Sequence, residues 1–183
     1  NIENNYLIKK VDIENLLIQI YNKNLILLDT QEIKNALLQN SFIESFEIKK
    51  KYPDTIKIKI FEKKPIAILF NKKKKFYLSE KIELIEFIQI SDFKNLPHVF
   101  ANQDAFKVFY YDLKKIKFPL NNIRKYTLFE TNRWDLETKN NIIVKLPSKN
   151  YIKSLKNYLD LSNKNSFKKY KVFDYRIDNQ LIL

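Results

Sequence analysis

The sequence of 183 residues contains no cysteine, no glycine and no methionine. Without cysteine the chain can form no disulfide, no thiolate metal site and no cysteine nucleophile. Without glycine it can form no glycine-rich loop for binding phosphate groups. Average proteins contain about 7% glycine, so the composition indicates either an AT-rich genome, which would also explain the abundant lysine, asparagine and isoleucine, or a designed sequence.

Residues that carry catalysis are also scarce. His98 is the one histidine of the sequence, and a single histidine forms neither a catalytic triad nor a histidine metal cluster. The acidic residues are scattered singly on predicted polar faces, and Ser148 is better placed to cap a helix than to act as a nucleophile. The sequence therefore predicts a protein that is not an enzyme, with no catalytic residues, no metal site and no cofactor.

Long hydrophobic runs are missing as well. No run of about 18 apolar residues occurs, and no signal-peptide pattern opens the chain. Hydrophobic residues nevertheless make up 45% of the sequence, which is ample for packed cores in one domain or two small ones. Because the chain begins at Asn1 without a methionine, we expect that an upstream segment has been removed.

Acidic residues are too few to balance the basic ones, and the net charge is +13. Residues 1–63 hold 10 basic and 9 acidic residues, whereas residues 64–183 hold 24 and 12. A basic surface can face nucleic acid, an anionic membrane or an acidic partner. The run Lys72–Lys75 could bind anionic lipid or phosphate, although a solvated loop tip, like a solvated basic surface in general, is the simpler interpretation.

Residues 44–70 contain the clearest structural pattern. Apolar and polar residues alternate from Thr55 to Ile60, which predicts a half-buried strand. Phe46 and Ile48 share one face of a preceding strand, and the turn residues between Tyr52 and Thr55 join the two strands into a hairpin.

Two helices are predicted upstream of this hairpin. Residues 1–8 are expected to begin a strand, and Asp12 is a candidate N-cap for a helix with apolar residues at helical spacing. Asp29, followed three residues later by Glu32, resembles a capping box for a second helix. This order predicts a small domain in which two helices cover one face of a three-stranded sheet.

Pro65 is disfavoured within a central strand and indicates a domain junction. We therefore expect a first domain of residues 1–63 and a second of residues 64–183. In the second part, apolar runs predict strands over residues 66–70, 76–79, 84–90, 124–129, 132–138, 142–146 and 171–183. Lys139-Asn140-Asn141 is expected to form the turn before the sixth of these, since asparagine tolerates a positive φ.

The second part also contains two predicted helices. Asp104 and Ser148 are their candidate N-caps, and Phe106, Phe109 and Leu113 share one face of the first helix. The predicted fold class is α+β. It consists of a small domain with a three-stranded sheet and two helices, followed by a β-rich domain with a mostly antiparallel sheet and about two helices.

Five short motifs follow one another along the second part. They are Pro65-Ile66-Ala67, Leu96-Pro97, Arg133-Trp134-Asp135-Leu136, Ile142-Ile143-Val144-Lys145-Leu146-Pro147 and Val172-Phe173-Asp174-Tyr175-Arg176. Together with K-K-Y-P-D-T-I-K-I-K-I at residues 50–60, they resemble the POTRA domain and the following β domain of the bacterial division proteins FtsQ and DivIB. Ala101, Asn141 and the Ile82-Glu83 region stand where family members commonly carry glycine, so local geometry is expected to depart from the family there.

The resemblance implies a non-enzymatic scaffold of the divisome. It implies one membrane helix upstream of this chain, anchored in the inner membrane, with these residues in the periplasm at the division septum. The implied partners are the extracytoplasmic parts of FtsB and FtsL, with other divisome membrane proteins as partners of the POTRA domain and no nucleic acid.

The resemblance also implies a binding site at the C-terminal edge of the β domain, where a partner adds a strand. The expected partner-binding residues are Arg133, Phe173, Tyr175, Arg176, Ile177, Asn179, Gln180, Leu181, Ile182 and Leu183. Arg176 and Ile177 are the main candidates for direct contact. Trp134 and Tyr175 are expected to belong to the core, and an intramolecular pair is the alternative for Arg176.

Two other functions remain open at this point. A POTRA domain would also suit a polypeptide-transport protein, although the hairpin around Trp134 argues against that class. A nucleic-acid-binding protein would explain the charge and the interleaved tyrosine and lysine. The lysines are, however, spread over many predicted elements instead of being gathered on one.

Overall fold

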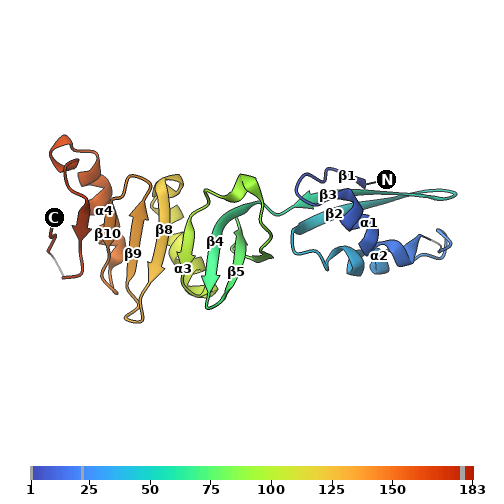
Figure 1. Ribbon diagram of the computed structural model, residues 1–183, viewed down its shortest axis with the longest axis horizontal. Helices are drawn as coiled ribbons and strands as arrows, with labels where there is room; N and C mark the ends of the chain where they lie inside the picture. Colours follow the sequence, from blue (N-terminus) through green and yellow to red (C-terminus); the bar gives the residue numbers. More distant parts are fainter. Residues whose placement is uncertain (1, 22, 178–179) are drawn as a thin grey trace. The chain divides into compact units, whose positions relative to one another are not determined.

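A computed structural model describes residues 2–21, 23–177 and 180–183 (Figure 1). The contacts within the chain divide it into two compact units, residues 1–65 with 79–86 and residues 66–78 with 87–183. The α+β fold class is confirmed, with two helices beside a three-stranded sheet in the first unit and two helices beside a larger sheet in the second.

The first unit contains a three-stranded sheet in the order β1-β3-β2. Its elements are β1 (Ile2–Glu3), α1 (Lys10–Leu16), the 3-10 helix η1 (Ile18–Ile20), α2 (Thr30–Leu37), β2 (Ile43–Lys51) and β3 (Thr55–Glu62). β2 and β3 form the predicted antiparallel hairpin, and β1 pairs in parallel with β3. Ile13, Ile33 and Ile60 are fully buried, so helices and sheet share one core.

The helix caps of the first unit were predicted with mixed success. Asp29 is the N-cap of α2, and its Oδ1 accepts a hydrogen bond of 2.9 Å from the backbone N–H of Gln31. The prediction for Asp12 is wrong, because α1 begins at Lys10 after the N-cap Lys9 and Asp12 lies inside the first turn. An acidic side chain there still favours the helix through its dipole.

The second unit is a mixed sheet with two helices. Its strands are β4 (Pro65–Asn71), β5 (Lys74–Ser79), β7 (His98–Phe100), β8 (Ile123–Leu128), β9 (Trp134–Thr138), β10 (Ile143–Lys145) and β11 (Val172–Asp174), in the order β11-β10-β9-β8-β7-β4-β5. The helices are α3 (Gln103–Lys115) and α4 (Tyr151–Ser162), and 3-10 helices cover Ser91–Phe93, Leu120–Asn122 and Asn165–Phe167. β6 (Leu84–Glu86) lies in the segment that groups with the first unit.

This sheet contains both antiparallel and parallel strand pairs. β9 is antiparallel to both β8 and β10. β7 is parallel to β4 and to β8, and β11 is parallel to β10. The sequence did not indicate β7, because a strand of three residues with Val99 as its one buried member is too short to show a period.

One row of side chains forms the core of the second unit. Register neighbours on six successive strands are all buried, namely Leu69, Val99, Tyr126, Leu136, Val144 and Phe173. α3 and α4 pack on this face of the sheet. The ring of Phe109 stacks on Trp134 with centroids 4.4 Å apart, and Tyr158 meets Phe173 edge to face at 5.0 Å. The expectation that Trp134 belongs to the core agrees with its burial.

Two cap predictions in this unit are wrong. α3 is capped by Asn102, whose Oδ1 accepts a hydrogen bond of 2.8 Å from the N–H of Ala105, and Asp104 lies in the first turn. α4 begins after Asn150, which has a left-handed backbone with φ 57°, and its side chain makes no capping bond. Ser148 lies two residues further upstream. Asn141 has φ 61°, as its predicted turn requires.

The lengths and polarity of the helices bear on whether they could cross a membrane. Within the described residues, every helix is too short or too polar to span a bilayer.

Candidate partner-binding edge

β11 is the last strand in the order of the second sheet, and β10 is its neighbour. The pair is held by hydrogen bonds from the N–H of Ile143 to the carbonyl of Lys171 and from the N–H of Tyr175 to the carbonyl of Lys145, each 2.8 Å long. Successive residues of a strand direct their backbone groups to opposite sides. The N–H and C=O of Asp174 therefore point away from β10.

The outer side of Asp174 is occupied by the end of the chain. The N–H of Asp174 donates to the carbonyl of Ile182 at 2.9 Å, and the N–H of Ile182 donates to the carbonyl of Asp174 at 3.0 Å. The last residues thus run antiparallel to β11 for one bridge. By the same alternation, the backbone groups of Leu181 and Leu183 point away from β11, to the outer side of the bridge.

Arg176 is engaged within the chain. Its Nε lies 2.9 Å from both carboxylate oxygens of Asp174, and a second guanidinium nitrogen lies 2.6 Å from Oδ2. These charge-assisted hydrogen bonds hold the pKa of Asp174 below its usual value. This is the intramolecular alternative described above. The predicted contact of Arg176 with a partner carboxylate stays a prediction.

Charged side chains of alternating sign form a row across β9, β10 and β11. Asp135 is the register neighbour of Lys145, which is the register neighbour of Asp174. Arg133 adds a further cation, with its Nε 3.3 Å from Oδ1 of Asp135. Burial raises the pKa of Asp135, and the nearby Arg133, Lys145 and Arg176 oppose that rise. The row therefore joins Arg133 and Arg176, which are 43 residues apart in sequence, into one electrostatic unit.

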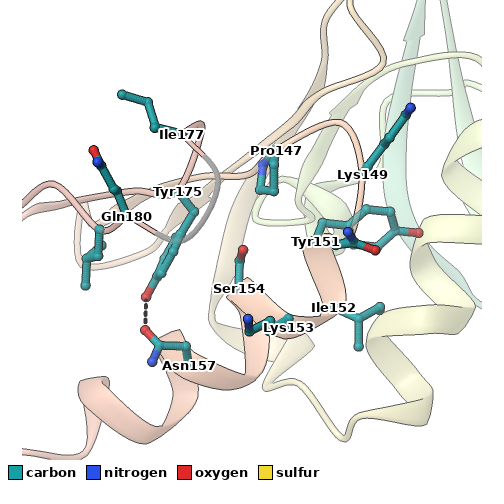
Figure 2. Close-up of a pocket in the computed structure, with 12 residues that line it drawn as sticks. Pro147, Lys149, Tyr151, Ile152, Lys153, Ser154, Asn157, Tyr175, Ile177 and Gln180 are labelled. Carbon is teal, nitrogen blue, oxygen red and sulfur yellow. Dashed lines mark hydrogen bonds between the residues drawn. The ribbon is translucent and has the colours of Figure 1, made fainter.

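A pocket of about 820 Å³ lies between the start of α4 and the segment after β11 (Figure 2). Four of the predicted residues line it, namely Tyr175, Ile177, Gln180 and Leu181. The Tyr175 hydroxyl donates a hydrogen bond of 2.9 Å to Oδ1 of Asn157 on α4 (Figure 2). Burial raises the pKa of this hydroxyl, so it stays a donor at neutral pH.

The predicted site residues differ strongly in accessibility. Phe173 and Tyr175 are only 2% and 6% exposed, so their side chains support the edge from within. Ile177 and Ile182 are each 52% exposed, and Leu183 is also exposed, so apolar surface lies beside the Asp174–Ile182 bridge. Asn179 lies outside the described residues.

The sequence did not indicate three contributors to this region. Asp174 orients Arg176, and Tyr151 and Asn157 bring α4 into the pocket. The Tyr151 hydroxyl donates a hydrogen bond of 2.7 Å to Asp112 on α3. The spacing Asp174-x-Arg176 was the one available signal, since side chains two apart on a strand share a face.

Comparisons with known proteins confirm the predicted resemblance. Residues 1–63 match the family model of the FtsQ-type POTRA domain. The chain is 33% identical to the cell division protein FtsQ of Rickettsia conorii over 159 residues, which cover 84% of this chain and 58% of that protein. It is 35% identical to FtsQ of Rickettsia typhi over 159 residues, which cover 84% of this chain and 59% of that protein. FtsQ of Agrobacterium fabrum is 28% identical over 138 residues, covering 72% of this chain and 42% of the relative.

This chain thus spans less than three fifths of the Rickettsia proteins that it matches. A solved structure of the major extracytoplasmic domain of the division protein DivIB from Geobacillus stearothermophilus is a slight match. Its TM-score is 0.39 at 15% identity, with 60% of this chain and 99% of that chain covered.

Proposed function

Since the chain is related to the FtsQ and DivIB division proteins, we propose that it is a non-enzymatic scaffold of the bacterial divisome. The similarity extends over 84% of the chain and therefore includes both units. In this proposal the boundary between the POTRA domain and the β domain falls between residues 63 and 64. The POTRA domain contacts other membrane proteins of the divisome.

The proposed partners are the extracytoplasmic parts of FtsB and FtsL. A strand of the partner adds to the edge formed by residues 181–183, which exposes backbone groups on the outer side of the Asp174–Ile182 bridge. Ile177, Ile182 and Leu183 supply exposed apolar contact area beside that edge. This edge with its apolar border is the observation that supports the proposal most directly.

The proposed location is the periplasm at the division septum. A single helix that spans the inner membrane, encoded upstream of Asn1, would anchor the protein there. Reading the parent gene tests this part, since about 20 consecutive apolar residues upstream of Asn1 are needed for a span.

Binding to the purified extracytoplasmic FtsB–FtsL pair, measured by isothermal titration calorimetry, tests the proposed contact. Ile177→Glu places a charge on the apolar border. Proline at Gln180, Leu181 and Ile182 removes the outward N–H of Leu181 and the Ile182 N–H that donates to the carbonyl of Asp174 and holds the edge on β11. Both variants should abolish measurable binding while the first unit stays folded. Val108→Glu, at an exposed apolar residue of α3, is the matched control and should bind normally. Unchanged affinity in either edge variant would exclude strand addition here.

A further inference from the structure

The face of the second sheet opposite α3 and α4 carries a compact group of aromatic and basic side chains. Side chains alternate along a strand, so the neighbours of the buried Val99, namely His98 and Phe100, project from this opposite face. Phe100 lies in β7 and is 39% exposed, whereas phenylalanine side chains are usually buried. Its ring stacks on Phe70 of β4, with centroids 4.7 Å apart and ring planes 14° apart.

Two lysines stand over these rings. The Nζ of Lys75 on β5 lies 5.3 Å from the ring centre of Phe70, and the Nζ of Lys125 on β8 lies 5.8 Å from that of Phe100. β4 and β5 run side by side (Figure 1), and His98 and Lys125 are register neighbours on β7 and β8. We call Phe70, Lys75, His98, Phe100 and Lys125 the aromatic–lysine face.

The imidazole of His98 lies inside this group, edge-on to Phe70 at 5.0 Å. The pKa of His98 is lowered, first by its burial and then by the charges of Lys75 and Lys125. The ammonium groups of Lys75 and Lys125 are thus both close enough to the His98 imidazole to disfavour its protonation. The exposed Lys72 and Lys73, at the turn between β4 and β5, add further positive charge beside it.

A carboxylate limits the positive charge on the β9 side of this face. Glu137 on β9 pairs with Arg124 and lies 3.5 Å from the Nζ of Lys125. Within the described parts of the chain, Lys75 has no ion pair, and its recorded contacts are with the rings of Phe70 and Phe87. The positive area therefore has room for a few carboxylates, whereas a nucleic-acid strand needs an extended basic track.

We propose that the aromatic–lysine face docks an acidic peptide segment of a partner protein, with carboxylates on Lys75 and Lys125 and apolar side chains on the stacked rings of Phe70 and Phe100. Complementary charge favours such a partner, and partly exposed aromatic side chains are typical of protein interfaces. A membrane surface fits less well, because the rings lie half-buried among the strands instead of projecting from a loop tip. This site is separate from the edge at β11, so it goes beyond the proposed FtsB and FtsL contact.

His98 makes the test direct, because it is the single histidine of the sequence and its imidazole resonances in NMR report on this face alone once any polyhistidine tag is removed. The probe is a synthetic 12-residue peptide of alternating glutamate and leucine, titrated into the labelled chain. The expected result is a saturable shift of the His98 signals. The bound carboxylates should also raise the pKa of His98, since they oppose the two lysines.

Variants assign the effect to the named residues. Lys75→Ala with Lys125→Ala should weaken peptide binding about tenfold, and Phe100→Ala about fivefold, as expected for surface charge pairs and aromatic contacts. Lys107→Ala with Lys156→Ala, two exposed lysines on α3 and α4, removes the same net charge and should bind like the unaltered chain. Thermal melts confirm that each variant is folded.

Three outcomes would overturn the proposal. One is equal affinity of the two double-lysine variants, which would mean attraction by net charge alone. Another is a His98 shift with a 12-nucleotide thymidine strand but none with the peptide, which would assign the face to nucleic acid. The third is a shift with phosphatidylglycerol vesicles but none with the peptide, which would assign it to lipid.

Discussion

Asp174 and Ile182 exchange both of their backbone hydrogen bonds, at 2.9 and 3.0 Å. The end of the chain therefore covers β11 at the point where the sheet would otherwise present an open edge. A partner strand has to pair with the outer side of residues 181–183 or displace them.

Ile182→Pro should open the bridge, because proline has no N–H to donate to the carbonyl of Asp174. The loss of about one hydrogen bond should cost roughly 1 kcal/mol of local stability. Hydrogen exchange at the Asp174 amide should become faster. Leu183→Pro is the matched control, since the Leu183 N–H points outward, and it should leave that amide protected. Equal protection in both variants would show that the bridge does not form in solution.

The Asp174–Arg176 pair predicts a pH dependence of stability. The folded-state pKa of Asp174 lies below its unfolded value, which is near 3.9. The pair therefore stabilises the fold fully above about pH 4, and this contribution is lost as the pH falls through the folded-state pKa. Asp174→Asn should lower the free energy of unfolding at pH 7 by on the order of 1 kcal/mol, and the difference should shrink in acid. Urea unfolding at pH 7 and pH 3 measures it, with Asp160→Asn on α4 as control.

His98 should titrate below the ordinary histidine pKa of about 6.5. Burial disfavours the imidazolium, and so do the charges of Lys75 on β5 and Lys125 on β8, while Glu137 on β9 faces Lys125 and offsets part of its effect. Lys75→Ala should raise the pKa of His98, as should Lys125→Ala. NMR titration of the imidazole measures both shifts. A pKa that stays constant in both variants would contradict the arrangement of charges.

The lowered pKa of His98 also makes the folding stability depend on pH. The unfolded chain binds a proton at His98 at a higher pH than the folded chain does, so folding loses stability as the pH falls from about 6.5 toward the folded-state pKa. His98→Gln should remove that part of the pH dependence in urea titrations between pH 7 and pH 5.

Glu62 holds the connection between β1 and α1. Its carboxylate accepts hydrogen bonds from the N–H groups of three successive residues, Tyr6, Leu7 and Ile8, at 2.8 to 3.1 Å. Glu62→Ala should destabilise the first unit by about 2 kcal/mol, because three donors lose a charged acceptor. Glu47→Ala, at an exposed position of the neighbouring strand, should change stability by less than about 0.5 kcal/mol. Amide hydrogen exchange of residues 1–65, measured in the full chain during thermal unfolding, distinguishes the two variants.

Local patterns in the sequence determined much of the fold. The alternation from Thr55 to Ile60 predicted β3, and the spacing of Phe106, Phe109 and Leu113 predicted the buried face of α3. Asn141 marked a turn, because asparagine tolerates the left-handed backbone found there. Each of these signals lies within one element, where periodicity and turn chemistry act over a few residues.

Contacts between distant segments were decided by the tertiary structure alone. The parallel pairing of β7 with β4 and β8, the bridge from Asp174 to Ile182 and the stacking of Phe70 on Phe100 join residues that no local period relates. The same holds for the row that links Asp135 to Lys145 and Asp174. Sheet order and register arise when whole strands compete to bury the Leu69 to Phe173 row, and that competition depends on the complete set of side chains facing the core.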